Sequence, residues 1–188
     1  MIVVGVIALA ATLAVPALAS ISGANARKAA GELAGSMRAL GDVAALRNAT
    51  CRMALDLEKR SWWAECAPGR AGIARDPERA PEASLEERFP DEKDAEVRRL
   101  LAKTSFGKLE DRLVKPRELP GRTAFGPVHV EGRRGAVEEG VAYVYFFAGG
   151  RAQRAIVPVV DGPNRYTVVL EPFTERARVV NGTVEVKE

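Results

Sequence analysis

The sequence has few of the residues on which most enzymes and metal sites depend. It contains one histidine and two cysteines among 188 residues. These numbers exclude a cysteine-rich zinc site and leave too few bases for most histidine-dependent hydrolases. Its 28 lysines and arginines stand against 25 acidic residues, so the formal net charge is only +3. That balance excludes a strongly basic nucleic-acid binder, and the length fits one domain with appendages.

Charge is also missing from the start of the chain. No charged side chain occurs from Met1 to Ala26, and most of this stretch is apolar. A run of about 20 apolar residues spans the hydrocarbon core of a bilayer as a helix. We therefore expect residues 1–23 to form a transmembrane helix, with kinks at Pro16 and Gly23. A cleaved secretory signal is the alternative, because Ala17-Leu18-Ala19 resembles a signal-peptidase site, although such signals need a positively charged start.

The next segment, residues 24–50, has the pattern of an amphipathic helix. Its apolar residues recur at spacings of three and four, and no proline interrupts them. We predict that it continues the membrane helix as one rod of about 45 residues and packs on a sheet. The face that we expect on the sheet consists of Ala30, Leu33, Met37, Leu40 and Ala44.

After Thr50 the spacing of the apolar residues changes from that of a helix to that of a strand, in which every second residue is apolar. Residues 51–57 and 61–66 are typical of two short strands joined by a turn. A turn centred between them places Arg52 opposite Glu65 and Cys51 opposite Cys66. Opposed Cβ atoms about 4.5 to 5.5 Å apart need only modest closure for a bridge. We predict a Cys51–Cys66 disulfide and an oxidising compartment such as the periplasm. Two buried thiols are the alternative.

The middle of the chain, residues 67–108, is charged and punctuated by prolines. We expect a loop excursion whose best helix covers residues 91–104. Such an excursion is either a partner-binding surface or a solvated insertion.

The remainder reads as strands separated by turns. Asn181-Gly182 is the strongest short hairpin signal, and Gly149-Gly150 marks another turn. We predict an antiparallel, meander-like sheet with the long helix available to cover one face, and hence an α+β fold for residues 51–188 and the helix. The expected strands are residues 123–130, 141–147, 154–160, 166–170, 176–180 and 183–186.

No catalytic constellation emerges from these segments. His129 alternates with valines in a strand and is interpreted as a surface residue. We expect no catalytic, cofactor-binding or metal-binding residues and no small-molecule substrate. The arginines of the last part could form a basic patch for nucleic acid, but neighbouring glutamates dilute it, so nucleic acid is not an expected partner. The arginines are Arg151, Arg154, Arg165, Arg176 and Arg178, and the glutamates are Glu171, Glu175 and Glu185.

An apolar first helix that continues into an amphipathic rod and then a small antiparallel domain resembles the type IV pilin and type II secretion pseudopilin superfamily. Residues 1–16, including Pro16, look like the family's first helix starting several residues late. We therefore expect the family's leader and Phe-Thr-Leu-Ile-Glu-like start upstream of Met1. The segments similar to GspH/FimT minor pseudopilins are 29–47, 51–63, 146–154 and 170–179. The excursion does not match, and Glu175 stands where the family often has glycine.

The resemblance implies a pilin-like fold, a single-pass anchor in the bacterial inner membrane and a periplasmic carboxyl-terminal domain. It implies inner-membrane lipid as the first partner, and other pseudopilins or pilins, bound through the amino-terminal helix, as later ones. The resemblance also implies protein transport as the process and methylation as a modification. The leading hypothesis is a non-enzymatic minor pseudopilin that initiates or caps the pseudopilus of a type II secretion system. The alternatives are a FimT-like minor pilin for DNA uptake or adhesion, and a membrane-anchored periplasmic enzyme with the excursion as a lid.

Overall fold

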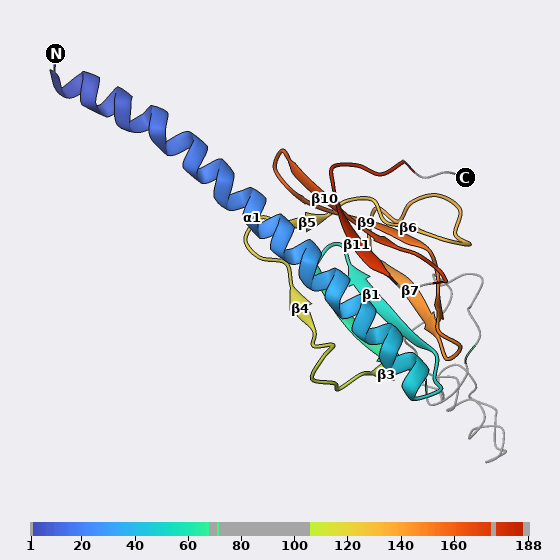
Figure 1. Cartoon of the computed structure of the whole chain (residues 1–188). Helices are drawn as coiled ribbons and strands as arrows, with labels where there is room; N and C mark the ends of the chain where they lie inside the picture. Colours follow the sequence, from blue (N-terminus) through green and yellow to red (C-terminus); the bar gives the residue numbers. More distant parts are fainter. Residues whose placement is uncertain (1, 68–70, 72–105, 174–175, 186–188) are drawn as a thin grey trace, which may run out of the picture.

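A single long helix opens the structure. The computed structural model describes residues 2–67, 71, 106–173 and 176–185, with side chains from Gly23 onward. Helix α1 (Ile2–Leu46) is continuous over 45 residues, which confirms the predicted rod. Its first half extends beyond the rest of the molecule, and its second half lies across the sheets (Figure 1). A continuous helix through Pro16 and Gly23 means that neither residue ends it.

The first sheet is built around the predicted hairpin. β1 (Cys51–Asp56) pairs with β2 (Ser61–Cys66) in the predicted register, with Arg52 opposite Glu65 and Cys51 opposite Cys66. The other edge of β1 pairs with β7 (Val141–Phe147), whose bounds agree with the prediction. The sheet is completed by β3 (Gly107–Lys108) and β4 (Arg117–Glu118) on β2, and by β8 (Arg151–Ala152) on β7.

The second sheet has a meander at its centre. β9 (Ala155–Asp161), β10 (Asn164–Leu170) and β11 (Ala177–Asn181) pair in chain order and antiparallel. The far edge of β9 pairs with two short strands, β5 (Ala124–Phe125) and β6 (His129–Val130).

The prediction of one meander-like sheet was therefore wrong, because the strands divide between two sheets. The turn at Gly149-Gly150 returns β7 to the short β8 and not to β9. β7 instead pairs with β1, which lies far away in the sequence. A buried central strand has N–H and C=O groups along both edges, so β1 needs a second partner besides β2.

Two strand predictions also need correction. The expected strand at residues 123–130 is two short strands, separated at Gly126. A Cβ at Gly126 would lie 3.0 Å from the Cβ of Pro158, so the backbone passes too close to β9 for an ordinary side chain. Residues 183–185 are not a strand, and Asn181-Gly182 is not a hairpin turn; β11 pairs with β10, and Gly182 N–H donates to the carbonyl of Arg165.

The core lies between α1 and the inner faces of both sheets. The helix contacts β9, β10 and β11 of one sheet and β1 and β7 of the other. Apolar side chains from all these elements form one buried cluster, because the apolar stripe of a helix and the inner faces of two sheets bury one another. The fold is thus α+β, with a long amino-terminal helix packed on antiparallel sheets, as predicted.

Candidate functional site

The amino-terminal half of α1 is the part of the helix that the sheets do not cover (Figure 1). The sequence of this half has no charged residue. The predicted transmembrane segment, residues 1–23, falls almost wholly on residues 1–22, whose side chains, including that of Pro16, lie outside the described part. Among the residues that are described, no helix has the length and apolarity that crossing a membrane requires. The predicted kinks and the membrane placement stay predictions.

The carboxyl-terminal half of α1 has a fully buried face. Ala26 and Ala29 are buried as well, and Ala26 is the first buried residue from Gly23 onward, at the point where the uncharged stretch ends. The structure places the predicted face residues in the core, each with no exposed surface: Ala30, Leu33, Met37, Leu40 and Ala44. This face holds the helix on the domain, while Leu46 at its end is 86% exposed.

A polar groove lies where α1 enters the domain. It has a volume of about 640 Å³ and runs between the helix and the start of β10. Its lining consists of Gly23, Ala24, Arg27, Lys28, Gly31, Asn164 and Tyr166, and we call it the Arg27 groove. Arg27 and Lys28 are exposed, and the lining contains two cations and no carboxylate. This groove was not anticipated, because Asn164 and Tyr166 are distant in the sequence and no local pattern brings them to the helix.

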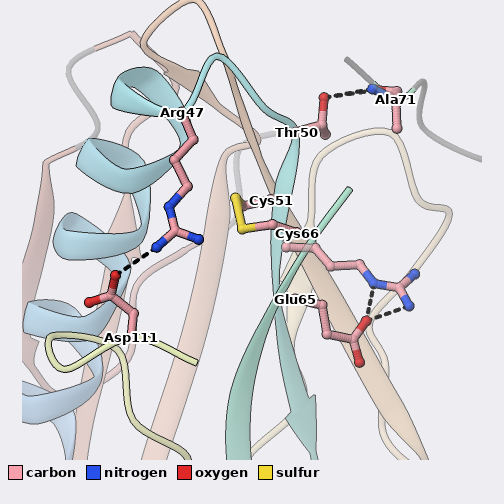
Figure 2. Close-up of a disulfide and its surroundings, with 8 residues drawn as sticks. Arg47, Thr50, Cys51, Glu65, Cys66, Ala71 and Asp111 are labelled. Atoms are coloured by element: carbon pink, nitrogen blue, oxygen red, sulfur yellow. Dashed lines mark hydrogen bonds and ion pairs between the residues drawn. A yellow bond between two sulfur atoms is a disulfide. The ribbon is translucent and has the colours of Figure 1, made fainter. Parts of the chain in front are cut away.

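The disulfide prediction is confirmed. Cys51 and Cys66 are bridged at the end of the β1–β2 hairpin, with their Cα atoms 4.0 Å apart. Beside the bridge, the Thr50 hydroxyl accepts a hydrogen bond from the Ala71 N–H at 2.9 Å and donates one to the Ala71 carbonyl at 3.1 Å (Figure 2). At the same end, β3 pairs with β2 through Cys66 and Gly107.

Both ends of the predicted excursion are therefore fixed at one place. The chain leaves the sheet after Ala67, whose N–H donates to the Thr50 carbonyl, and it returns at β3. The remainder of the excursion, including the helix expected at residues 91–104, lies outside the described residues.

An aromatic and ionic cluster covers the outer face of the first sheet. The guanidinium of Arg52 lies between the rings of Phe106 and Tyr143, at 4.4 and 4.1 Å from their centroids. It donates to Glu65 at 2.6 Å, and Trp63 Nε1 donates to the same carboxylate at 2.7 Å. Only the Arg52–Glu65 pair could be anticipated from the hairpin register.

The protonation of Arg52 follows from this environment. Burial by itself lowers its pKa, but a hydrogen bond to Tyr145 and the charge of Glu65 outweigh burial and raise the pKa above its ordinary value. The guanidinium is thus a permanent charge that holds these aromatic rings together. The cluster ties β1, β2 and β7 to Phe106.

A second cleft lies beside β8. It has a volume of about 550 Å³ and is lined in part by Phe147, Arg151 and Phe173. Phe173 is 73% exposed, and the Arg151 guanidinium lies 5.0 Å from its ring centroid. No group in this lining completes a catalytic set.

The arginines considered for a nucleic-acid patch are partly neutralised. Arg154 and Arg178 both form ion pairs with Glu171, at 3.4 and 3.8 Å. His129 is half-buried in β6, so it is less exposed than the surface position that we expected. Within the described ranges, no group of three or more histidine, cysteine, aspartate or glutamate residues could hold a metal ion.

Comparison with known proteins adds one structural likeness. No protein-family model and no curated protein matches the chain. A solved structure with a similar arrangement is that of the minor pseudopilin EpsH from the Type 2 Secretion System of Vibrio cholerae, which is 9% identical in sequence. The match covers 84% of this chain and 95% of that one, with a TM-score of 0.48.

Proposed function

We propose that the protein is a minor pseudopilin, a structural subunit of the periplasmic pseudopilus of a type II secretion system, at its tip or in its initiation complex. Residues 1–23 would anchor it in the inner membrane and later enter the fibre core. Residues 24–50 would join this anchor to the domain of residues 51–188 in the periplasm. The sequence resemblance suggests this function, and the architecture is the physical support for it.

The observation that carries the proposal is a continuous helix whose two halves have different surroundings. From Gly23 onward the first buried residue of α1 is Ala26, and the amino-terminal half of the helix projects beyond the sheets with no charged residue in its sequence. Apolar helix surface that its own domain does not cover is stable in lipid or against other apolar helices. A subunit that moves from a bilayer into a bundle of such helices exchanges one apolar environment for another.

The same geometry suits a polymer. A helix that projects from one side of a domain presents different surfaces to the subunits before and after it. Such heterologous contacts generate an open helical assembly when the rotation that relates one subunit to the next does not close into a ring. The disulfide supports a periplasmic location for the domain, because such bonds persist in oxidising compartments. The proposed role needs neither a cofactor nor a substrate site.

The proposal is tested by genetics with matched variants in the source bacterium. The gene is deleted and complemented with the wild type, with Val15→Asp or with Val179→Asp. Val15 lies in the uncharged half of α1, and Val179 is 38% exposed on β11. A carboxylate in the helix core costs about 2.5 to 3.5 kcal/mol in a membrane. We expect exoproteins to accumulate in the periplasm in the deletion strain and with Val15→Asp, and export to be restored by Val179→Asp.

Two results would contradict the proposal. Normal export in the deletion strain, with lost DNA uptake or adhesion instead, would favour the FimT-like pilus function. Full complementation by Val15→Asp would show that the uncharged half needs no apolar surroundings. Immunoblots must show equal amounts of both variants, since a degraded variant would imitate loss of function.

A further inference from the structure

We propose that the Arg27 groove binds the phosphate of an anionic phospholipid headgroup. The inference rests on the proposed function, because it requires the uncharged half of α1 to lie in a bilayer. It adds a defined ligand class and a binding site to the anchor.

The position of the groove follows from the order of residues along α1. Arg27 and Lys28 are the first charged side chains after the uncharged stretch. When a helix leaves the hydrocarbon core, its first charged residues lie in the headgroup layer, where long cationic side chains contact lipid phosphates. The groove that these cations line would therefore lie at the level of the headgroups.

The chemistry of the lining suits an anion. Two cations and no carboxylate line the groove. Neither Arg27 nor Lys28 has an ion-pair partner among the described residues. A guanidinium binds phosphate through two parallel hydrogen bonds, and lysine adds a point charge. Tyr166, half-buried on the opposite wall, is a residue type that is enriched at membrane interfaces.

Gly31 leaves room for a headgroup. Gly23 and Gly31 stand four residues before and after Arg27, so all three lie on the same side of the helix. Both glycines are in the groove lining, and a Cβ at Gly31 would meet no atom within 4 Å. The cation is therefore not covered by the residues one turn away, and a side chain at Gly31 would extend from a Cβ that stands in open space.

The lining also includes a part of the domain that is fixed relative to the helix. Asn164 and Tyr166 come from β10, which follows the tight Gly162-Pro163 turn. A Cβ at Gly23 would lie 3.1 Å from Asn164 Oδ1, so helix and strand are in close contact here. A headgroup held between them would fix both the depth of α1 and the orientation of the domain above the membrane.

The test uses the full chain and two double variants that remove the same charge. Arg27→Gln/Lys28→Gln alters the groove. Arg112→Gln/Lys115→Gln removes two exposed cations near Asp111, which pairs with Arg47 at the other end of the domain. Gly31→Leu fills the groove without changing the charge. The wild type and the three variants are first floated with phosphatidylcholine liposomes. This step measures membrane insertion of the helix in the absence of an anionic lipid.

Phosphatidylglycerol binding is then measured by native mass spectrometry of each protein released from mixed micelles, with phosphatidylcholine as the reference lipid. A cation near an anionic surface contributes about fivefold in affinity. We expect Arg27→Gln/Lys28→Gln to reduce retention of phosphatidylglycerol by at least about fivefold, Gly31→Leu to reduce it as well, and Arg112→Gln/Lys115→Gln to leave it unchanged. Inorganic phosphate at constant ionic strength should not displace the lipid.

The outcomes separate the site from the function. If the wild type fails to float, the proposed function is wrong. If it floats and the groove variants retain phosphatidylglycerol as well as the wild type does, the inference is wrong and the function stands. Displacement of the lipid by inorganic phosphate would identify a free-anion site. If Arg27→Gln/Lys28→Gln lost salt-sensitive self-association but still bound the lipid, the groove would be a protein interface. Either result overturns the lipid assignment.

Discussion

At the scale of single residues, burial decides how much each ion pair contributes. The Arg52 and Glu65 side chains are only 13% and 8% exposed, and their charges meet at 2.6 Å. Glu171, by contrast, is 34% exposed, and its partners Arg154 and Arg178 are more exposed still. Removing one member of a buried pair leaves an uncompensated charge, whereas water solvates the partners of an exposed pair.

This difference gives a prediction with a matched control. Glu65→Ala should lower the free energy of unfolding by about 3 kcal/mol, because it leaves the Arg52 guanidinium without its counter-charge. It also removes the acceptor of Trp63 Nε1. Glu171→Ala should cost less than about 1 kcal/mol. Urea unfolding of the full chain in a mild detergent, followed by circular dichroism, measures both. Equal losses would mean that the buried pair is no more important than the exposed one.

At the scale of elements, the sequence predicted those features that depend on residues close together in the chain. The apolar spacing of α1 and the register of β1 with β2 agree with the structure, because each follows from residues close together in the chain. The pairing of β1 with β7 was missed. Nothing in either strand alone specifies a partner so distant in sequence, since any apolar strand of suitable length satisfies the same hydrogen bonds.

The candidate site was less predictable than the fold for the same reason. The order of uncharged and charged residues in α1 indicated an anchor, which stays a prediction, whereas Cys51 was correctly assigned to Cys66. The Arg27 groove needs β10 beside α1, and the Arg52 cluster needs Phe106 beside β1. Both depend on tertiary contacts. The hairpin predicted at Asn181-Gly182 does not form: β11 pairs with β10, and the Gly182 N–H donates to the carbonyl of Arg165 in β10.

The packing of α1 on the sheets can be tested by one substitution at two positions. Leu33 is fully buried against the sheets, and Leu46 is 86% exposed. Leu33→Ala should lower the free energy of unfolding by about 3 kcal/mol, because it removes buried methyl groups and leaves a cavity. Leu46→Ala should change it by less than about 0.5 kcal/mol. The urea midpoints of the two variants check this, and a large effect at Leu46 would show that the helix end is covered in solution.

At the scale of the whole molecule, the residues that form the core are separate from those that we propose as the anchor. The buried helix face starts at Ala26, so the core should not need the residues before it. A chain that begins at Ala24 should keep the disulfide and a free energy of unfolding within about 0.5 kcal/mol of the full chain. A chain that begins at Gly35 lacks Ala30 and Leu33 and should not fold cooperatively. Thermal unfolding and mass mapping of Cys51–Cys66 distinguish these outcomes, and an unfolded Ala24 chain would contradict them.

The way in which residues 67 and 107 are held has a consequence for how such a protein can vary. Ala67 follows β2, and Gly107 pairs with Cys66 at the end of that strand, so the chain departs and returns at neighbouring positions. Closing a longer loop between fixed ends costs little extra entropy. Evolution could therefore exchange the residues between Ala71, which binds Thr50, and Phe106, which contacts Arg52, for a shorter or longer stretch, and a protein engineer could insert an epitope there, while the hairpin and its bridge keep their geometry.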